Sequence, residues 1–357
     1  MRITTNAILR NYKSNLGASL SNLDMARTKV MTQRKFNSTA EDPSSALRAA
    51  VLQRKYARNE DYRTLVQDVQ SFQDSQEDAA MQINTLAKTL SKQYGLEALN
   101  GTNGSKETRE TYADAWRGAQ ESMVLSLNAS YEGKYVFAGS DGMNAPFKLT
   151  KDANGKQILL YRNVDVTTGE LYGEDGKINT DNAINNPTSN QKRLEQLSND
   201  TLFVDLGFGL NIDDNTGIDP SSVFNTSLPG INVVGFGTNT ETGNSKNMII
   251  LMGQIADMLD AEEFDYEGYR DMLAEFDEGR DTVLEKVTML GTQTEFLTTT
   301  KDRLDTAMIN LSTQIDNVVN VDMAEAIMNF SWAQYAYNAA LKVGNNILTP
   351  SFIDFMR

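Results

Sequence analysis

Hydrophobic positions near the start of the chain recur at a fixed interval. Leu9, Leu16, Leu23 and Val30 are seven residues apart, and Leu20 falls on the same side of a helix. A narrow apolar stripe of this kind is typical of a helix that packs against another helix. A buried leucine contributes only ~1.5–3 kcal/mol, and only when it is covered. The first 40 residues therefore need a partner helix.

A polar break and a second helical pattern follow. Asp42 suits the N-cap of a helix, and Pro43 suits its first position, where the missing N–H is no loss. A turn signal at 100–104 and another helical pattern over 106–131 then predict an antiparallel pair of helices. The stripe of the first of these helices has the three-and-four spacing of a bundle and consists of Tyr62, Leu65, Val69, Phe72, Gln76, Ala79, Ile83, Leu86 and Leu90.

The pattern changes after residue 133. Asp-Gly and Asn-Gly turn signals separate short strand candidates, of which the clearest are Gln157–Tyr161, Leu202–Leu206 and Ile231–Val234. Four of the six prolines lie between residues 146 and 229. These signals predict a small β-rich domain over 145–245.

Helical periodicity returns at Asn247 and continues toward the end of the chain. The jump from Val318 to Met323 breaks the repeat and predicts a kink or a join between two helices. The stripe before the jump consists of Phe276, Val283, Val287, Leu290, Leu297, Leu304, Met308, Leu311, Ile315 and Val318, and the stripe after it of Met323, Ile327, Phe330, Tyr337 and Leu341.

These patterns are nested, with helices at both ends and strands in the middle. They predict a mainly α protein with a β-rich insertion: a long antiparallel helical bundle formed by both ends of the chain, carrying a small β domain and ending in coiled-coil-type terminal helices. The predicted segments are a helical assembly segment at 1–42, the first half of the helical core at 43–144, the inserted domain at 145–245, the second half of the core at 246–314, and a second assembly segment at 315–357.

Composition narrows the function classes. The chain has no cysteine and no histidine, so thiol and imidazole chemistry, zinc sites built on these residues and disulfides are excluded. A net charge of −15 disfavours nucleic acid, although residues 1–58 carry eleven basic and three acidic residues. No apolar run reaches the ~20 residues of a membrane span, and the start lacks the ~7–15-residue apolar stretch of a cleaved signal. We expect no catalytic residues, metal, cofactor, nucleic acid or membrane.

Five stretches of the sequence resemble the flagellin-like axial proteins of the bacterial flagellum. The start, Met1-Arg2-Ile3-Thr4-Thr5-Asn6, resembles the start of this family, and Phe36–Pro43 has its small–acidic–acidic entry to the core helix. Tyr135-Val136-Phe137-Ala138-Gly139-Ser140 is similar to a stretch found in the members that join hook to filament, and not expected in flagellin. Val321–Ala326 and Tyr335–Leu341 resemble the terminal helix of the family.

The resemblance implies a structural protein that joins hook to filament by assembling into a ring through its terminal helices. It implies four partners: further copies of the chain, the proximal hook-associated junction protein, flagellin, and a type III export chaperone that binds the C-terminal region. It also implies a secreted, extracellular protein exported without a cleaved signal peptide.

The terminal stripes are the candidate assembly interface, although periodicity alone is equally typical of core helices in a soluble bundle. The small and aromatic residues where helix changes to strand form a candidate domain join, made of Tyr135, Phe137 and Gly139. The assembly candidates are Leu9, Leu16, Leu20, Leu23, Val30, Leu311, Ile315, Val318, Met323, Ile327, Phe330, Tyr337 and Leu341.

Two alternative functions stay open. The first is flagellin itself, which has the same helical plan. The second is a carboxylate-dependent enzyme acting on a glycan, which would need two facing carboxyl groups in the middle domain. A calcium loop over Asp213–Asp219 is disfavoured, because the closing bidentate glutamate is missing.

Overall fold

The structure is a computed structural model that describes residues 5–100, 105–152, 155–173, 176–179, 181, 184–213 and 217–348. These residues fall into two compact units. The terminal unit is drawn from residues 1–61 and 303–357, and the central unit is Tyr62–Asp302.

The terminal unit contains α1 (Thr5–Thr32), the first part of α2 (Pro43–Thr89), the last part of α8 (Tyr266–Val319) and α9 (Met323–Leu348). The predicted helix start at Asp42 is confirmed, because its Oδ1 accepts a hydrogen bond from the Ser45 N–H at 3.0 Å. The predicted break is also confirmed, since α8 ends at Val319 and α9 begins at Met323. The five-segment division itself stays a prediction, and its boundary at 314/315 falls inside α8.

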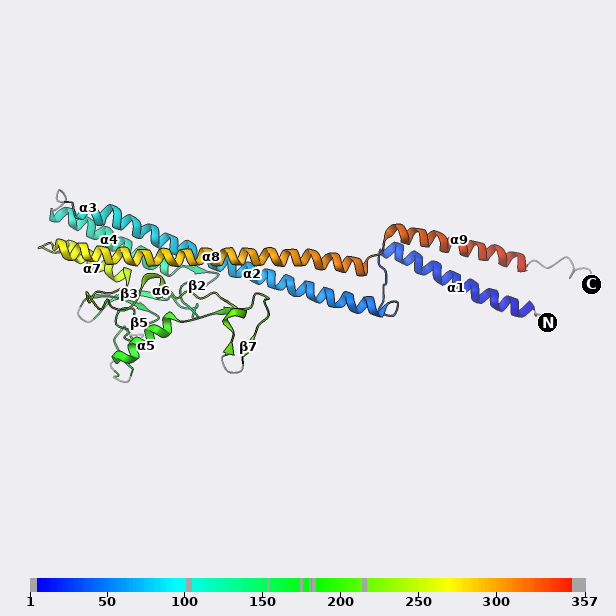
Figure 1. Ribbon diagram of the computed structural model, residues 1–357, viewed down its shortest axis with the longest axis horizontal. Helices are drawn as coiled ribbons and strands as arrows, with labels where there is room; N and C mark the ends of the chain where they lie inside the picture. Colours follow the sequence, from blue (N-terminus) through cyan, green and yellow to red (C-terminus); the bar gives the residue numbers. More distant parts are fainter. Residues whose placement is uncertain are drawn as a thin grey trace, which may run out of the picture. The chain divides into compact units, whose positions relative to one another are not determined.

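The central unit contains the helical core (Figure 1). The rest of α2 leads through a π-helical turn, Leu90–Gly95, and α3 (Leu96–Ala98); α4 (Lys106–Leu127) then returns along it. The α7 helix (Met248–Asp260) packs on α4, and the first part of α8 completes the bundle. Asn247 caps α7, because its side chain accepts hydrogen bonds from the N–H groups of residues 249 and 250.

The insertion is built from short antiparallel pieces. β3 (Phe147–Lys151), β4 (Gln157–Tyr161) and β5 (Val164–Asp165) form a three-stranded sheet, in which Phe147 pairs with Tyr161. This sheet contacts α4 and α7. The remaining strands pair two by two: β1 (Ser130–Tyr131) with β2 (Lys134–Tyr135), β6 (Phe203–Val204) with β9 (Phe224–Asn225), and β7 (Ile212–Asp213) with β8 (Gly217–Ile218).

The strand predictions have mixed outcomes. The strand at Gln157–Tyr161 is confirmed, and within Leu202–Leu206 only Phe203–Val204 is a strand. The prediction for Ile231–Val234 was wrong: it is the short helix α6, which follows Pro229-Gly230 and ends at Gly235, whose φ is 82°. Four apolar residues in a row fit a buried helical turn as well as a buried strand.

The insertion also holds a helix that the sequence reading missed. α5 (Pro187–Ser198) begins with Pro187 at its first position, and the Asn186 side chain accepts a hydrogen bond from the Ser189 N–H. The fold class is nevertheless as predicted, with helices from both ends of the chain and a β-containing insertion between them. Among the described residues, no helix is both long enough and apolar enough to span a membrane.

Candidate assembly interface and domain join

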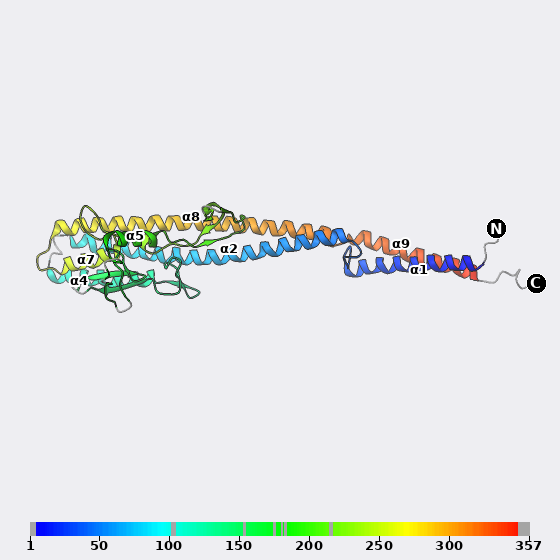
Figure 2. The same ribbon diagram turned by 90° about the horizontal axis from the view of Figure 1, so that it is seen from below.

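The two terminal helices form a pair. α1 and α9 run side by side in opposite directions (Figures 1 and 2). Tyr12 of α1 packs so closely on Gly344 of α9 that a Cβ at position 344 would overlap the tyrosine ring. Ala326, one turn into α9, is only 4% exposed. The partner helix that the N-terminal stripe requires is thus supplied by the other end of the same chain.

Most predicted interface residues lie along this intrachain seam or on the end of α8. They share partial burial in the monomer and are Leu9, Leu16, Leu23, Val30, Leu311, Ile315, Val318, Met323, Phe330 and Tyr337. Three others keep a large exposed area: Leu20 (49%), Ile327 (50%) and Leu341 (42%). The monomer therefore covers one side of the stripes and leaves another side open.

The most exposed apolar face of α9 includes residues that the sequence reading missed. Met328 is 57% exposed, and Trp332 and Tyr335 are each 70% exposed. Together with Ile327 and Ser331 they line a shallow groove of about 580 Å³. Their spacing of four and three indicates one face of a helix. Of this face, the predicted stripe includes only Ile327. A face with an exposed tryptophan and tyrosine is typical of a protein–protein contact.

Hydrogen bonds to backbone carbonyls connect the chain at the C-terminal end of α1 with the chain at the N-terminal end of α9. The Lys35 N–H donates to the Val319 carbonyl at 2.8 Å, and the Val321 N–H donates to the Gln33 carbonyl at 3.0 Å. The Lys35 ammonium also donates to the Asn317 carbonyl at 2.6 Å. These bonds tie the segment that follows α1 to the end of α8 and to the segment that precedes α9.

The domain join occupies the stretch from Tyr135 to Ser140. Phe137 is fully buried, whereas Tyr135 is partly exposed beside an apolar groove of about 420 Å³. The Tyr161 hydroxyl donates to the Phe137 carbonyl at 3.1 Å, and burial raises the pKa of Tyr161 well above its ordinary value. Gly139 has a φ of 73°, a conformation that L side chains rarely adopt. Tyr135 ends β2, and Phe137 and Gly139 follow it before β3 begins at Phe147; their role as a domain join stays a prediction.

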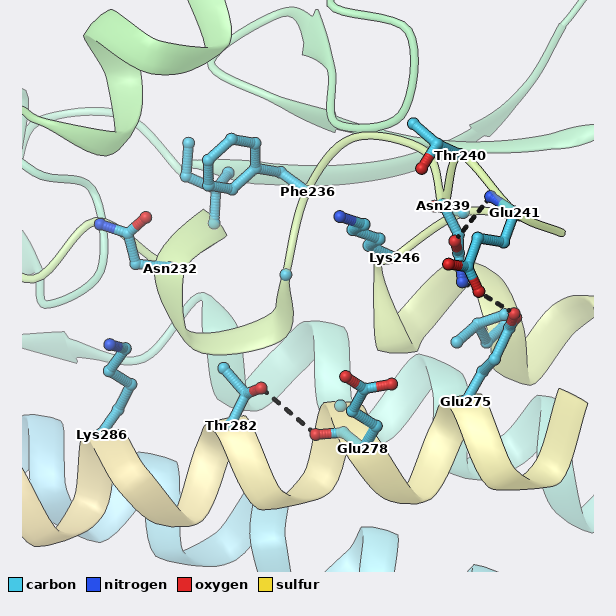
Figure 3. Close-up of a pocket in the computed structure, with 15 residues that line it drawn as sticks. Asn232, Phe236, Asn239, Thr240, Glu241, Lys246, Glu275, Glu278, Thr282 and Lys286 are labelled. Carbon is cyan, nitrogen blue, oxygen red and sulfur yellow. Dashed lines mark hydrogen bonds between the residues drawn. The ribbon is translucent and has the colours of Figure 1, made fainter. Parts of the chain in front are cut away.

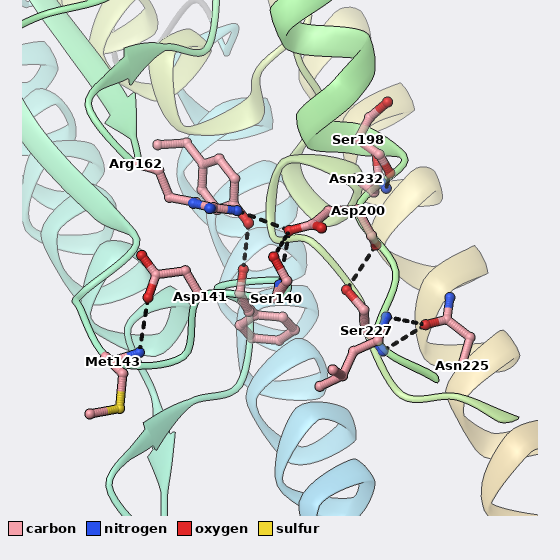
Figure 4. Close-up of polar contacts among 12 residues, drawn as sticks. Ser140, Asp141, Met143, Arg162, Ser198, Asp200, Asn225, Ser227 and Asn232 are labelled. Carbon is pink, nitrogen blue, oxygen red and sulfur yellow. Dashed lines mark hydrogen bonds and ion pairs between the residues drawn. The ribbon is translucent and has the colours of Figure 1, made fainter. Parts of the chain in front are cut away.

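Asp200 locks the turn at the end of this stretch (Figure 4). Its Oδ2 accepts the Ser140 N–H at 2.9 Å, the Ser140 hydroxyl at 2.7 Å and Arg162 Nη1 at 2.9 Å. Partial burial disfavours the ionised form of Asp200, but the bonds from Ser140 and the charge of Arg162 outweigh it and lower the pKa of Asp200. A Cβ on Gly139 would lie 2.6 Å from the same oxygen.

Gln76 joins the core helix to both sides of the insertion. It is 1% exposed, and its Nε2 donates to the Val136 carbonyl at 2.6 Å and lies 3.5 Å from the Thr226 carbonyl. The sequence pattern places Gln76 within the apolar stripe of this helix. A polar residue inside such a stripe was the available signal, because a buried amide needs hydrogen-bond partners.

A polar cleft of about 770 Å³ lies between the 231–246 segment and α8 (Figure 3). The Glu275 carboxylate accepts hydrogen bonds from Asn239 Nδ2 at 3.1 Å, Thr242 Oγ1 at 2.6 Å and Asn244 Nδ2 at 2.9 Å. This carboxylate anchors a loop. Within the described residues, no group of three or more acidic side chains is placed to hold a metal ion. The Asp213–Asp219 segment lies partly outside those residues.

Comparisons with known proteins agree with this architecture. Residues 3–141 match the bacterial flagellin N-terminal helical region, which confirms the resemblance to the flagellar axial proteins over this part of the chain. No curated protein matches the chain. A putative flagellar hook-associated protein from Vibrio parahaemolyticus has the same fold, with a TM-score of 0.56 at 14% identity, over 78% of this chain and 100% of that one.

Two further solved structures are more distant. The hook-associated protein-3 of Legionella pneumophila has a TM-score of 0.48 at 13% identity, over 75% of this chain and 98% of that one. FlgL of Bacillus cereus has a TM-score of 0.47 at 15% identity, over 74% of this chain and 99% of that one.

Proposed function

We propose that this chain is a hook-associated junction protein of the bacterial flagellum, which joins hook to filament by assembling into a ring through its terminal helices. The observation that carries the proposal is the pairing of α1 with α9, with an apolar face of α9 left uncovered around Trp332. The flagellin-type N-terminal region and the hook-associated fold support the same reading.

The covered side and the exposed side of the paired helices have different roles in this proposal. The seam residues hold α1 on α9 inside one chain, and the outward residues contact the neighbouring copies. Leu20, Ile327 and Leu341 belong to the outward set, together with Met328, Trp332 and Tyr335. Burying an aromatic side chain of this size removes roughly 150–250 Å² from water, so several such contacts per copy would favour the ring over the monomer.

The partners follow from the position in the flagellum. The proposed ring contacts the proximal hook-associated junction protein on one side and flagellin on the other, and both are extracellular. Before assembly the exposed face of α9 requires protection, and a type III export chaperone that binds the C-terminal region would supply it. Export without a cleaved signal peptide belongs to the same proposal, as does the absence of enzymatic activity.

The test is electron microscopy of cells that lack the gene, with the medium assayed for flagellin. We expect bare hooks and flagellin monomers in the medium, because filaments have nothing to attach to. Cells that lose their filaments and release no flagellin would instead show that this chain is the filament subunit, the second candidate that the match over residues 3–141 favours. Normal filaments would contradict both readings.

A finer test uses the exposed face of α9. Trp332→Ala together with Tyr335→Ala should give bare hooks while the chain is still made and exported. The matched control is Leu125→Ala, which removes an equally exposed apolar side chain (73%) from the central unit. Filament numbers that fall equally in both would argue against a specific role for α9.

A further inference from the structure

The central unit carries an exposed apolar patch of its own. Ile212 and Ile218 are paired across the β7–β8 hairpin and are 62% and 42% exposed. Phe208 (46% exposed) stacks on Phe296 (44% exposed) of α8, with ring centroids 5.7 Å apart. With Leu210, 48% exposed, these residues are called the hairpin patch. They expose roughly 400 Å² of apolar side chain, which is within the range of functional patches.

The charged residues in the sequence around the hairpin patch are all acidic. Between residues 194 and 245 the chain has seven acidic residues and no lysine or arginine. Asp219, next to Ile218, is held ionised because hydrogen bonds from Ser221 lower its pKa. Asp213 and Asp219 adjoin Ile212 and Ile218 in the chain, so a complementary surface combines apolar side chains with positive charge beside them.

The first turns of α2, in the terminal unit, have these properties. Leu47 is 66% exposed, and Arg54, Lys55 and Arg58 are exposed on the same side of the helix. Ala49 and Leu52, on the opposite side, are 5% and 7% exposed and face the bundle. From 43 to 58 the chain has four basic residues and no acidic one. Within the described part of the chain, Arg54, Lys55 and Arg58 form no ion pair.

We propose that the hairpin patch of one copy docks on the Leu47–Arg58 face of α2 in a second copy. The inference rests on the self-assembly in the proposed function and adds a second contact to it. The two surfaces differ, so the contact is head-to-tail, and contacts of this kind close into rings when the rotation permits. The patch area is about half of the ~800 Å² per partner of a stable interface. The contact therefore forms where the terminal helices already hold the copies together.

The absence of cysteine allows a direct test, because only introduced thiols can be cross-linked. Cells lacking the gene would produce the full chain with Leu47→Cys and Ile212→Cys, and isolated flagella would be treated with an oxidant or a short bis-maleimide. We expect a ladder of multimers on a non-reducing gel, since each copy links to the next. Each single variant should stay monomeric. The matched control is Leu125→Cys with Ile212→Cys, in which the second thiol lies on another exposed position of the central unit.

A second variant pair covers the case in which the first does not assemble. Lys55→Cys with Ile218→Cys tests the same two surfaces at different positions. Arg54→Glu with Arg58→Glu, added to the linked pair, should lower the ladder yield by roughly tenfold, because like charges then face each other.

The outcomes separate the contact from the proposed function. If the cells grow filaments but Leu47→Cys with Ile212→Cys gives no more multimers than the control pair, the contact is overturned and the junction role stands. Dimers from Ile212→Cys alone would overturn the contact too, because they indicate patch-to-patch pairing. If cells lacking the gene grow normal filaments, the junction role fails. Cross-linking of the purified chain, concentrated until it self-associates, then tests the contact alone: a ladder supports it, and oligomers that do not cross-link overturn it.

Discussion

The two units differ in what they can bury without help. The largest fully buried side chains, including Trp116, Tyr269 and Phe276, all belong to the central unit. In the described part of the terminal unit the buried hydrophobic residues are Ala49, Leu52, Leu304 and Ala326. Ordering a residue costs ~1–2 kcal/mol of backbone entropy, and buried apolar area must offset it. One chain thus combines a unit that has a large hydrophobic core of its own with a terminal unit that buries few hydrophobic side chains among its described residues.

Hydrogen exchange on the monomer tests the difference between the two units most directly. Backbone amides of α1 and α9 should exchange more than about a thousandfold faster than those of α2 between Val66 and Ala87. Sparsely packed helices open locally, whereas core helices open only with the whole unit. Mass spectrometry of peptides from each helix measures the difference. Equal protection in both units would show that the terminal helices are stable within a single chain.

The two tryptophans give a matched pair of substitutions. Trp116 is fully buried, with its ring centroid 4.9 Å from that of Phe276, whereas Trp332 is 70% exposed. Trp116→Ala should lower the free energy of unfolding by about 3–5 kcal/mol through the cavity it leaves. Trp332→Ala should change it by less than about 0.5 kcal/mol. Urea unfolding followed by circular dichroism provides both values. A large loss in Trp332→Ala would mean that α9 is already part of a monomeric core.

Within the central unit, a pair of glycines tests the domain join. Gly139→Ala should destabilise the unit by about 2 kcal/mol or more, because the new Cβ meets Asp200 and the backbone has a positive φ. Gly133 has a similar φ of 78° with nothing within 4 Å of its Cβ position, so Gly133→Ala should cost only about 1 kcal/mol. If both variants lose the same amount in urea unfolding, the contact with Asp200 adds nothing.

The smallest expected effect concerns pH. Because the pKa of Asp200 is lowered in the folded chain, its ionised form adds stability above the unfolded pKa of ~3.9, and this is lost as pH falls through the folded pKa. The urea midpoint of the wild type should therefore fall more steeply between about pH 5 and 3 than that of Asp200→Asn. Parallel pH profiles would contradict this. Asp219→Asn removes another carboxylate of lowered pKa and should flatten the pH profile in the same direction.

The sequence predicted the helical parts well, because amphipathic stripes, the Asp42-Pro43 start and the break before Met323 are local signals. The insertion was harder to predict. Its strands are two to five residues long. The hydrogen bonds that stabilise it join residues far apart in the sequence. Asp200 binds Ser140, 60 residues away, and Gln76 contacts the backbone at Val136 and Thr226. No periodicity reports such pairs.

The candidate site was predicted in part for a similar reason. Periodicity places residues such as Leu16 and Phe330 on one side of a helix. It does not say which of two apolar sides a partner from the same chain will cover. The structure assigns the covered side to the α1–α9 seam and leaves Met328, Trp332 and Tyr335 exposed. The assembly role of the predicted residues stays a prediction until the variants of α9 are tested.

The position of Gln76 also bears on how this architecture can be modified. The Gln76 side chain contacts the backbone at two distant points of the chain, Val136 just after β2 and Thr226 just after β9. The stretch between these two points therefore begins and ends at fixed positions beside α2. Replacing the whole stretch would remove Phe147, Leu159 and Tyr161 from the hydrophobic core, so a foreign domain has to be inserted within an exposed loop of the stretch and not in its place. A domain inserted there would be held near α2 on both sides, because Gln76 contacts the backbone at both Val136 and Thr226.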